Sequence, residues 1–153
     1  YYGDPEKSCS CSSTQIINYQ KRLSGPLLDR IDLTVNVSRV PHEALLQQKS
    51  LSNSQHKQYQ SVITSALSSQ KNRYKRSNKN NGSLSSKEVE PFVPLSSEAN
   101  AFLLTAAKKL DLSARSYFKI IKVARTIADL DGVTDIDIPQ LAESLQYRQI
   151  STL

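Results

Sequence analysis

An arginine, Arg30, is the residue of this sequence best placed to do chemistry. It lies in the run Leu-Ser-Gly-Pro-Leu-Leu-Asp-Arg-Ile-Asp-Leu at residues 23–33, directly before a segment with strand-like alternation. A guanidinium presented there can reach a phosphate site on a neighbouring molecule, because its planar fork of donors matches phosphate oxygens. The chain carries no phosphate-binding G-x-x-x-x-G-K-[ST] loop of its own, since its four glycines are scattered. The run therefore points to one part of a larger machine.

A second arginine, Arg115, falls in the first turn of a helix predicted to start near Ser113. The helix macrodipole already makes that end positive, so a cation there is locally unfavourable. An arginine placed against the local electrostatics favours an anionic partner such as a nucleotide phosphate. Lys119 and Lys122 cluster with it on the side opposite the apolar face, where a solvated surface is the ordinary interpretation.

The net charge of +6 is concentrated in the middle of the chain, where residues 41–90 hold eight basic side chains against three acidic ones. A short basic run, with an aromatic side chain inside it, comprises Lys71, Arg73, Tyr74, Lys75, Arg76 and Lys79. Such cations seek phosphates, and Tyr74 could stack on a base, so the run is a candidate nucleic-acid contact. A solvated loop whose charges only keep the chain soluble explains the same composition. Both interpretations stay open at this point.

The two cysteines, Cys9 and Cys11, are separated by one residue. This spacing is too close for an easy disulfide, and two thiolates are too few for a tetrahedral zinc site. One interpretation is a pair of reduced thiols in a surface loop. The other is half of a metal site whose remaining ligands lie upstream of this sequence.

Most of the chain has helical periodicity. A helix capped by Thr14 is expected through residue 22, and a strand is expected over 32–37, with Leu33, Val35 and Val37 on its buried face. Residues 54–73 predict a helix that places Tyr59, Val62, Ile63, Ala66 and Leu67 together, and residues 77–86 predict a loop. Three amphipathic helices, entered at Ser96, Ser113 and Asp137, predict a small helical bundle.

The composition bounds the class of protein. No stretch approaches the roughly 20 apolar residues that cross a bilayer, and no leader is apparent, so we expect a soluble cytoplasmic chain without membrane contact. Methionine is absent, even at the first position, and Tyr1 to Pro5 have the composition of a loop interior. We therefore expect an excised fragment of a longer protein.

Three motifs resemble the C-terminal part of the YifB/ComM family, the magnesium-chelatase-like branch of the AAA+ ATPases. They occur in the same order and frame nearly the whole chain. The motifs are residues 23–33, then Leu112-Ser113-Ala114-Arg115-Ser116-Tyr117 running into Val123-Ala124-Arg125-Thr126-Ile127-Ala128-Asp129-Leu130, then Ala142-Glu143-Ser144-Leu145-Gln146-Tyr147-Arg148.

This resemblance implies roles for individual residues. Arg30 is similar to the arginine finger that reaches the γ-phosphate bound by an adjacent subunit, and Arg115 is similar to the sensor 2 arginine of the helical lid. Cys9 and Cys11 match the second Cys-x-Cys of the family, whose first pair would lie upstream. The whole protein would use ATP and Mg²⁺ in a hexameric ring of identical subunits that moves along DNA during natural transformation. This piece, without Walker A and B segments, should hold neither ATP nor Mg²⁺ and should be inactive alone.

The resemblance also implies a domain organisation. Residues 1–40 would be the C-terminal remnant of the α/β ATPase core with one helix and one strand, 41–90 a helix and basic linker, and 91–153 the helical lid. The fold class expected is therefore mainly α. Two other functions stay open: a chelatase-type motor subunit that remodels a protein partner, and a free-standing DNA-binding helical domain.

Overall fold

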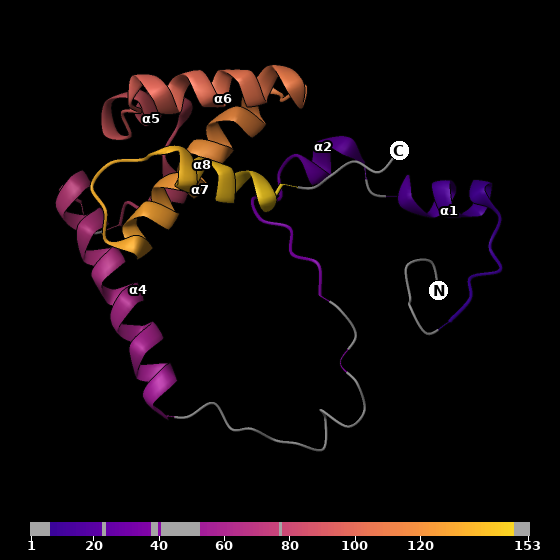
Figure 1. The fold of residues 1–153 in the computed structure, drawn as a ribbon, viewed down its shortest axis with the longest axis horizontal. Coiled ribbons are helices and arrows are strands. Elements are labelled where there is room, and N and C mark those ends of the chain that lie inside the picture. The colour runs from indigo at the N-terminus through magenta and orange to yellow at the C-terminus, as the bar shows by residue number, and fades with distance from the viewer. Residues whose placement is uncertain (1–6, 23, 38–39, 41–52, 77, 149–153) are drawn as a thin grey trace. The chain divides into compact units, whose positions relative to one another are not determined.

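A long helix, α7 (Ala114–Asp131), organises the larger of two units in the chain (Figure 1). The structure is a computed structural model that describes residues 7–22, 24–37, 40, 53–76 and 78–148. One unit comprises residues 1–48 with 149–153, and the other comprises residues 49–148. The described residues are mainly helical, as the sequence predicts.

The first unit contains α1 (Ser13–Gln20) and the single turn α2 (Gly25–Leu28). The predicted helix is confirmed, but its cap is Ser12 and not Thr14. The Ser12 hydroxyl accepts from the Gln15 amide at 3.3 Å, and the Gln15 side chain accepts from the Ser12 amide at 2.9 Å. This reciprocal pair is a capping box, and it satisfies two backbone donors where a Thr14 cap would satisfy one.

The predicted strand at Asp32 to Val37 is wrong for the described chain, which forms no regular element there. The three side chains expected on a buried face are exposed, with Leu33 at 52%, Val35 at 64% and Val37 at 85%. A strand needs a neighbouring strand to satisfy its backbone donors and acceptors. The alternation of apolar residues indicates which face of a strand would be buried, but it does not provide the neighbouring strand that a sheet needs.

The second unit is built around α7. It contains α4 (Asn53–Tyr74), the 3₁₀ turn η1 (Asn81–Ser83), α5 (Ser86–Phe92), α6 (Ser97–Lys109) and α8 (Ile138–Gln146). Helix α7 packs against α4, η1, α5 and α8, and α6 packs against α8. The stretch between residues 53 and 92 is thus part of the same compact unit as the lid helices.

The three lid helices begin where the sequence predicts. The Ser96 hydroxyl accepts from the Ala99 amide at 3.1 Å, and the Ser113 hydroxyl accepts from the Ser116 amide at 3.1 Å. The predicted apolar faces line the core, which includes Ala99, Leu103, Ile120, Ile121, Ala124, Ala128, Ile136 and Leu141. Within the described residues, no helix is both long and apolar enough to cross a membrane.

Helix α4 confirms the predicted helix at 54–73 but buries only part of its apolar face. Ala66 is 4% exposed, whereas Tyr59, Val62, Ile63 and Leu67 are between 38% and 60% exposed. The C-terminal half packs on α7, and the N-terminal half extends beyond the other helices of the unit (Figure 1).

Residues 78–86 differ from the loop that the sequence predicts over 77–86. They contain η1, whose Asn81 is 2% exposed, and they lead into α5, a helix that the sequence pattern does not predict because Pro91 lies within it. The polar composition of this segment gives no indication that it is buried, because Asn81 is buried through hydrogen bonds and not through apolar contact.

Helix α7 ends at Gly132, which adopts a left-handed conformation with φ of 74°. Its amide and that of Val133 donate to carbonyls of the last turn, and the chain then reaches Ile136, which forms a parallel bridge with Leu95. Glycine alone takes this conformation without steric cost.

We predict that Gly132→Ala lowers the free energy of unfolding by about 1 kcal/mol, because alanine is strained at this φ. A methyl group there would meet no neighbouring residue within 4 Å, so the cost is strain of the local backbone and not a clash with the rest of the fold. Gly82→Ala is the control, since its Cβ would lie at an ordinary 3.5 Å from the nearest atom. Urea unfolding followed by circular dichroism measures both; equal effects of the two substitutions would contradict the prediction.

Candidate functional site

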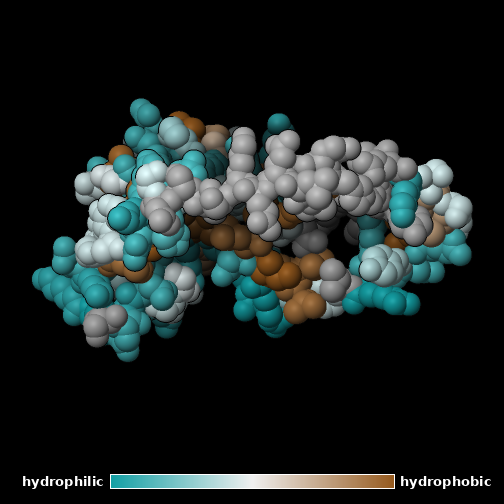
Figure 2. Space-filling model, turned by 90° about the horizontal axis from the view of Figure 1, so that it is seen from below, coloured by the Kyte–Doolittle hydropathy of each residue, from teal (hydrophilic) through white to brown (hydrophobic). Residues whose placement is uncertain are grey.

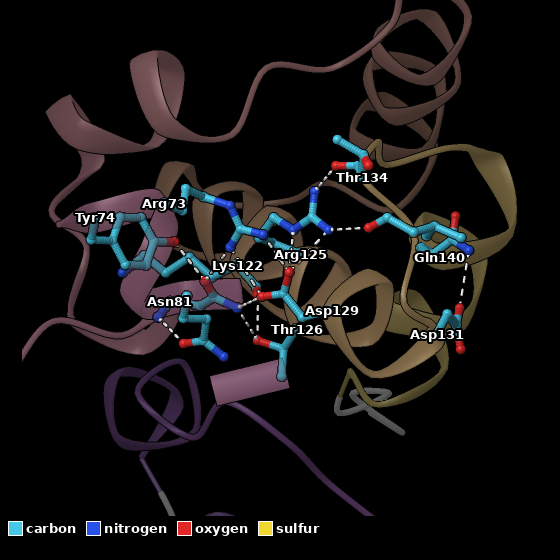
Figure 3. Close-up of polar contacts among 12 residues, drawn as sticks. Arg73, Tyr74, Asn81, Lys122, Arg125, Thr126, Asp129, Asp131, Thr134 and Gln140 are labelled. Atoms are coloured by element: carbon cyan, nitrogen blue, oxygen red, sulfur yellow. Dashed lines mark hydrogen bonds and ion pairs between the residues drawn. The ribbon is translucent and has the colours of Figure 1, made fainter. Parts of the chain in front are cut away.

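The carboxylate of Asp129, on α7, is the centre of a buried polar network (Figure 3). Its side chain is 1% exposed. Arg73 of α4 forms an ion pair with it and also donates from Nη1 to Oδ2 at 3.0 Å. Arg125, one turn earlier on α7, donates from Nε to Oδ1 at 3.2 Å. One buried anion therefore holds two cations from two helices.

Asn81 of η1 joins the same network through both ends of its side-chain amide (Figure 3). The amide nitrogen donates to Asp129 at 2.9 Å and to the Thr126 hydroxyl at 3.0 Å. The amide oxygen accepts from the Tyr74 hydroxyl at 2.5 Å. These bonds satisfy a fully buried amide, and they fix the turn between α4 and α5 onto α7.

Arg125 also anchors the connection between α7 and α8. Its guanidinium is 4% exposed and donates to the backbone carbonyls of Val133, at 2.7 Å, and Thr134. Burial lowers the pKa of Arg125, and the hydrogen bonds from Arg73 to Asp129 raise the pKa of Arg73. Both remain cations, because arginine does not lose its proton in proteins.

The basic run divides into two groups. Arg73, Tyr74 and Lys79 serve the fold: Arg73 pairs with Asp129, Tyr74 is 4% exposed, and Lys79 pairs with Glu88. The Tyr74 ring packs edge-on against Phe92 with centroids 5.3 Å apart, so it is not available to stack on a base, contrary to the sequence-based interpretation. The remaining cations, Lys71, Lys75 and Arg76, are exposed.

The Lys79 pair has a clear electrostatic effect on its partner. Hydrogen bonding from Lys79, with further bonds from the Ser85 amide and hydroxyl, lowers the pKa of Glu88 to about 2. The Glu88 carboxylate accepts from the Ser85 amide at 2.9 Å and so also caps α5. A cation read from sequence as a nucleic-acid contact is therefore engaged in fixing a helix start.

Arg115 lies in the first turn of α7, as the sequence predicts, and is exposed. That turn contains no acidic residue, and Ser113 caps it. The helix behind Arg115 is held by the apolar core and by the Asp129 network. The guanidinium is therefore exposed at the start of a helix whose backbone is held in place.

Arg30 lies in the first unit, two residues after α2, and is exposed. Its Nη1 donates to the Pro26 carbonyl at 2.7 Å, so the side chain folds back over its own turn. The Gly25-Pro26 pair thus sets both the turn and the local position of the guanidinium.

Cys9 and Cys11 are reduced thiols, with Cys9 half-buried and Cys11 exposed. Hydrogen bonding from the Cys11 amide lowers the pKa of Cys9, and the hydrogen bond with Cys9 raises the pKa of Cys11. Among the described residues, no group of three or more metal-ligating side chains comes together. Metal binding by the pair stays a prediction.

Sequence reasoning missed the centre of the network. Asp129 and Arg125 lie within a motif that carries the family resemblance, but neither residue was assigned a role. The sequence does contain an indication of this pair, because Arg125 and Asp129 are four residues apart and lie beside the apolar positions of α7. The sequence contains no such indication for Asn81, since an asparagine in a polar segment ordinarily indicates a turn.

Comparison with known proteins agrees with this architecture. Residues 38–148 match the family described as magnesium chelatase, subunit ChlI C-terminal, and residues 1–45 match magnesium chelatase, subunit ChlI. The boundary between the two matches falls between α2 and α4. The chain therefore belongs to the magnesium chelatase ChlI C-terminal family.

The chain is also similar to individual proteins. The chain is 42% identical over 144 residues to competence protein ComM of Haemophilus influenzae, covering 93% of this chain and 27% of ComM. It is 36% identical over 143 residues to the uncharacterized protein YifB of Escherichia coli, covering 94% of this chain and 28% of YifB. The chain thus spans less than a third of either relative, and it is similar to both over nearly its whole length.

We predict that Asp129→Asn lowers the free energy of unfolding by about 3 kcal/mol, because it leaves the buried Arg125 and the half-buried Arg73 without their anion. Asparagine preserves the volume, so the loss measures charge and not packing. Asp131→Asn, on an exposed side chain at the end of α7, is the matched control and should stay within about 0.5 kcal/mol of the unmodified chain. Thermal and urea unfolding give both values, and an Asp129 variant as stable as the control would rule out this role.

Proposed function

We propose that this chain is the lid and arginine-finger part of a magnesium-chelatase-like AAA+ ATPase. The whole protein would form a hexameric ring of identical subunits that uses ATP hydrolysis to move along DNA. The ComM relative is named a competence protein, and DNA handling during natural transformation is the role that we propose for this chain's parent.

Arg115 carries the proposal. An exposed arginine in a first turn without acids is electrostatically unfavourable unless an anion binds there. Its helix is also fixed to α4, η1 and the connection before α8 by Asp129 and Arg125. A phosphate bound by Arg115 would therefore be coupled to the position of the whole helical unit, as a sensor 2 role requires.

Arg30 supports the same function from the first unit. Its guanidinium is exposed, and its bond to the Pro26 carbonyl leaves other donors of the fork for a phosphate. At the γ-phosphate of an adjacent subunit it would neutralise charge that develops during phosphoryl transfer.

The residues of this chain could form only part of a site for ATP and Mg²⁺. Its exposed arginines suit contacts to phosphate oxygens, whereas the sequence has no glycine-rich loop to surround the phosphates. Bound nucleotide would supply the anion, and the residues of this chain would orient and neutralise it. The remainder of the site belongs to other parts of the parent protein.

DNA contact is supported by Lys71, Lys75 and Arg76, which are exposed where α4 ends. Half of the basic run serves the fold, which weakens the case for a free-standing DNA-binding domain. A chelatase-type motor that remodels a protein partner would use Arg30 and Arg115 in the same way, and DNA binding separates that alternative from a DNA motor.

We predict that Arg30→Ala in the full-length parent lowers the ATP turnover rate by about 10³-fold with ATP affinity nearly unchanged, because the residue acts on a neighbour's nucleotide. Arg115→Ala should weaken ATP binding as well. Arg22→Ala, an exposed arginine of the same unit as Arg30, is the control and should leave both unchanged. Turnover that survives Arg30→Ala would refute the finger assignment.

We predict that the 153-residue chain binds duplex DNA with a Kd of about 1–100 µM at low salt. Replacing Lys71, Lys75 and Arg76 with glutamine should reduce the slope of log K against log salt by about 3, one unit for each lost phosphate contact. The matched control replaces the exposed Lys87, Lys108 and Lys109 with glutamine. Fluorescence anisotropy measures the slopes, and equal slopes for the two triple variants would exclude the basic run as the DNA contact.

A further inference from the structure

An Asn-Gly pair lies in the turn η1, where Asn81 is followed by Gly82. No other asparagine of the sequence precedes a glycine. Hydrophilic side chains occupy much of the face seen in Figure 2, and asparagine ordinarily lies among them. Asn81 is instead 2% exposed. Asn-Gly is the sequence in which a side-chain amide is lost most readily, because glycine has no Cβ to obstruct attack by its own backbone nitrogen.

Deamidation of this pair needs no reactant other than water. The backbone nitrogen of Gly82 attacks Cγ of Asn81, and the side-chain nitrogen leaves as ammonia with the proton that Gly82 gives up through the solvent. One C–N bond forms and one breaks, and the product is a cyclic succinimide. Water then opens the ring at either carbonyl. The result is aspartate, or isoaspartate, in which the main chain continues through the side-chain carboxyl carbon.

Hydrogen bonds of the folded unit restrain the groups that must react. The side-chain nitrogen, which must depart, donates to Asp129 at 2.9 Å and to the Thr126 hydroxyl at 3.0 Å. The backbone amide of Asn81 donates to the Gln70 side chain at 3.0 Å, which fixes the main chain beside the bond that would form. Gln70 is itself only 7% exposed. Breaking these bonds requires η1 to separate from α7 and from α4.

We propose that Asn81-Gly82 is a deamidation site controlled by the fold, which reacts only while η1 is open and cannot close again after it has reacted. The rate of amide loss then follows the population of the open state, because closed molecules do not react. Neither nucleotide nor DNA enters this chemistry, so the inference is independent of the function proposed above.

Both products misfit the place that Asn81 occupies. Aspartate puts an oxygen where the side-chain nitrogen donates to Asp129, so two carboxylates face each other and the hydrogen between them is lost. Arg73 and Arg125 offset part of the added charge, but they do not replace the lost hydrogen bond. Isoaspartate adds a main-chain carbon inside a turn that the Ser83 amide closes with a 3.1 Å bond to the carbonyl three residues earlier. Either change detaches η1 from α7.

Ageing of the 153-residue chain tests the control by the fold. Samples are kept in mildly alkaline buffer with and without denaturing guanidinium chloride, and peptide mapping by mass spectrometry follows all eight asparagines. Deamidation is detected as the replacement of a side-chain NH₂ group by OH. The exposed Asp131, which precedes Gly132, can isomerise without a change of mass and so does not contribute to this signal. Asn78, exposed in the connection between α4 and η1, is the internal control.

Asn81 should react faster than any other asparagine in denaturant, and at least about tenfold more slowly in buffer than in denaturant. The rate at Asn78 should differ far less between the two conditions. Thr126→Val removes one acceptor of the leaving nitrogen at nearly constant volume and should raise the Asn81 rate in buffer about fivefold, because η1 opens more easily. Equal Asn81 rates in buffer and denaturant would overturn the proposal, as would a faster reaction of another asparagine in denaturant.

Refolding tests the consequence of the reaction. Gly82→Ala is the matched variant, because its Cβ would lie at an ordinary 3.5 Å from the nearest atom of the fold and would hinder ring closure. After ageing in denaturant and dilution into buffer, the fraction of the unmodified chain that regains its original urea midpoint should fall in proportion to the Asn81 converted. Gly82→Ala should refold almost in full after the same treatment. A converted chain with the urea midpoint of fresh protein would refute the proposal.

Discussion

The buried carboxylate of Asp129 is the constraint on which the helical unit depends. Removing a charge from water costs several kcal/mol unless partners replace the solvent, and here the partners of the carboxylate come from three places along the chain. Arg73, Asn81 and Arg125 bind the carboxylate directly, and Arg125 extends the network to the Val133 and Thr134 carbonyls. These contacts tie helices α4 and α7, the turn η1 and the connection to α8 to one buried anion.

Two cations around one anion leave an excess of positive charge in a partly buried place. Backbone carbonyls stabilise Arg125, and the Arg73 side chain keeps 21% of its surface exposed. The arrangement explains why a basic run does not translate simply into a binding surface. Arg73 and Lys79 look like their neighbours in the sequence, but their partners, Asp129 and Glu88, lie 56 and 9 residues away along the chain.

The sequence was sufficient for the elements whose cause is local. Helix α7 could be predicted because its apolar positions recur at helical spacing and Ser113 caps it, and α6 and α8 follow the same logic. The strand at 32–37 could not be settled from alternation, because strand formation depends on a second strand. Asn81 and Asp129 could not be assigned because their burial depends on each other across 48 residues. The positions of Arg30 and Arg115 could be predicted from the local turn and helix start in which they lie, whereas their chemical roles were inferred only from the family resemblance.

The capped and anchored α7 has a mechanical consequence. Arg115 and Asp129 lie about four helical turns, or roughly 21 Å, apart along one continuous helix. Ser116, Ile120 and Ile121 are buried along this helix, so its N-terminal half is packed like the rest and does not tilt independently of the core. The helix therefore joins the exposed Arg115 to the buried carboxylate as one packed element, and any displacement of its N-terminus is shared with η1 and the C-terminal half of α4.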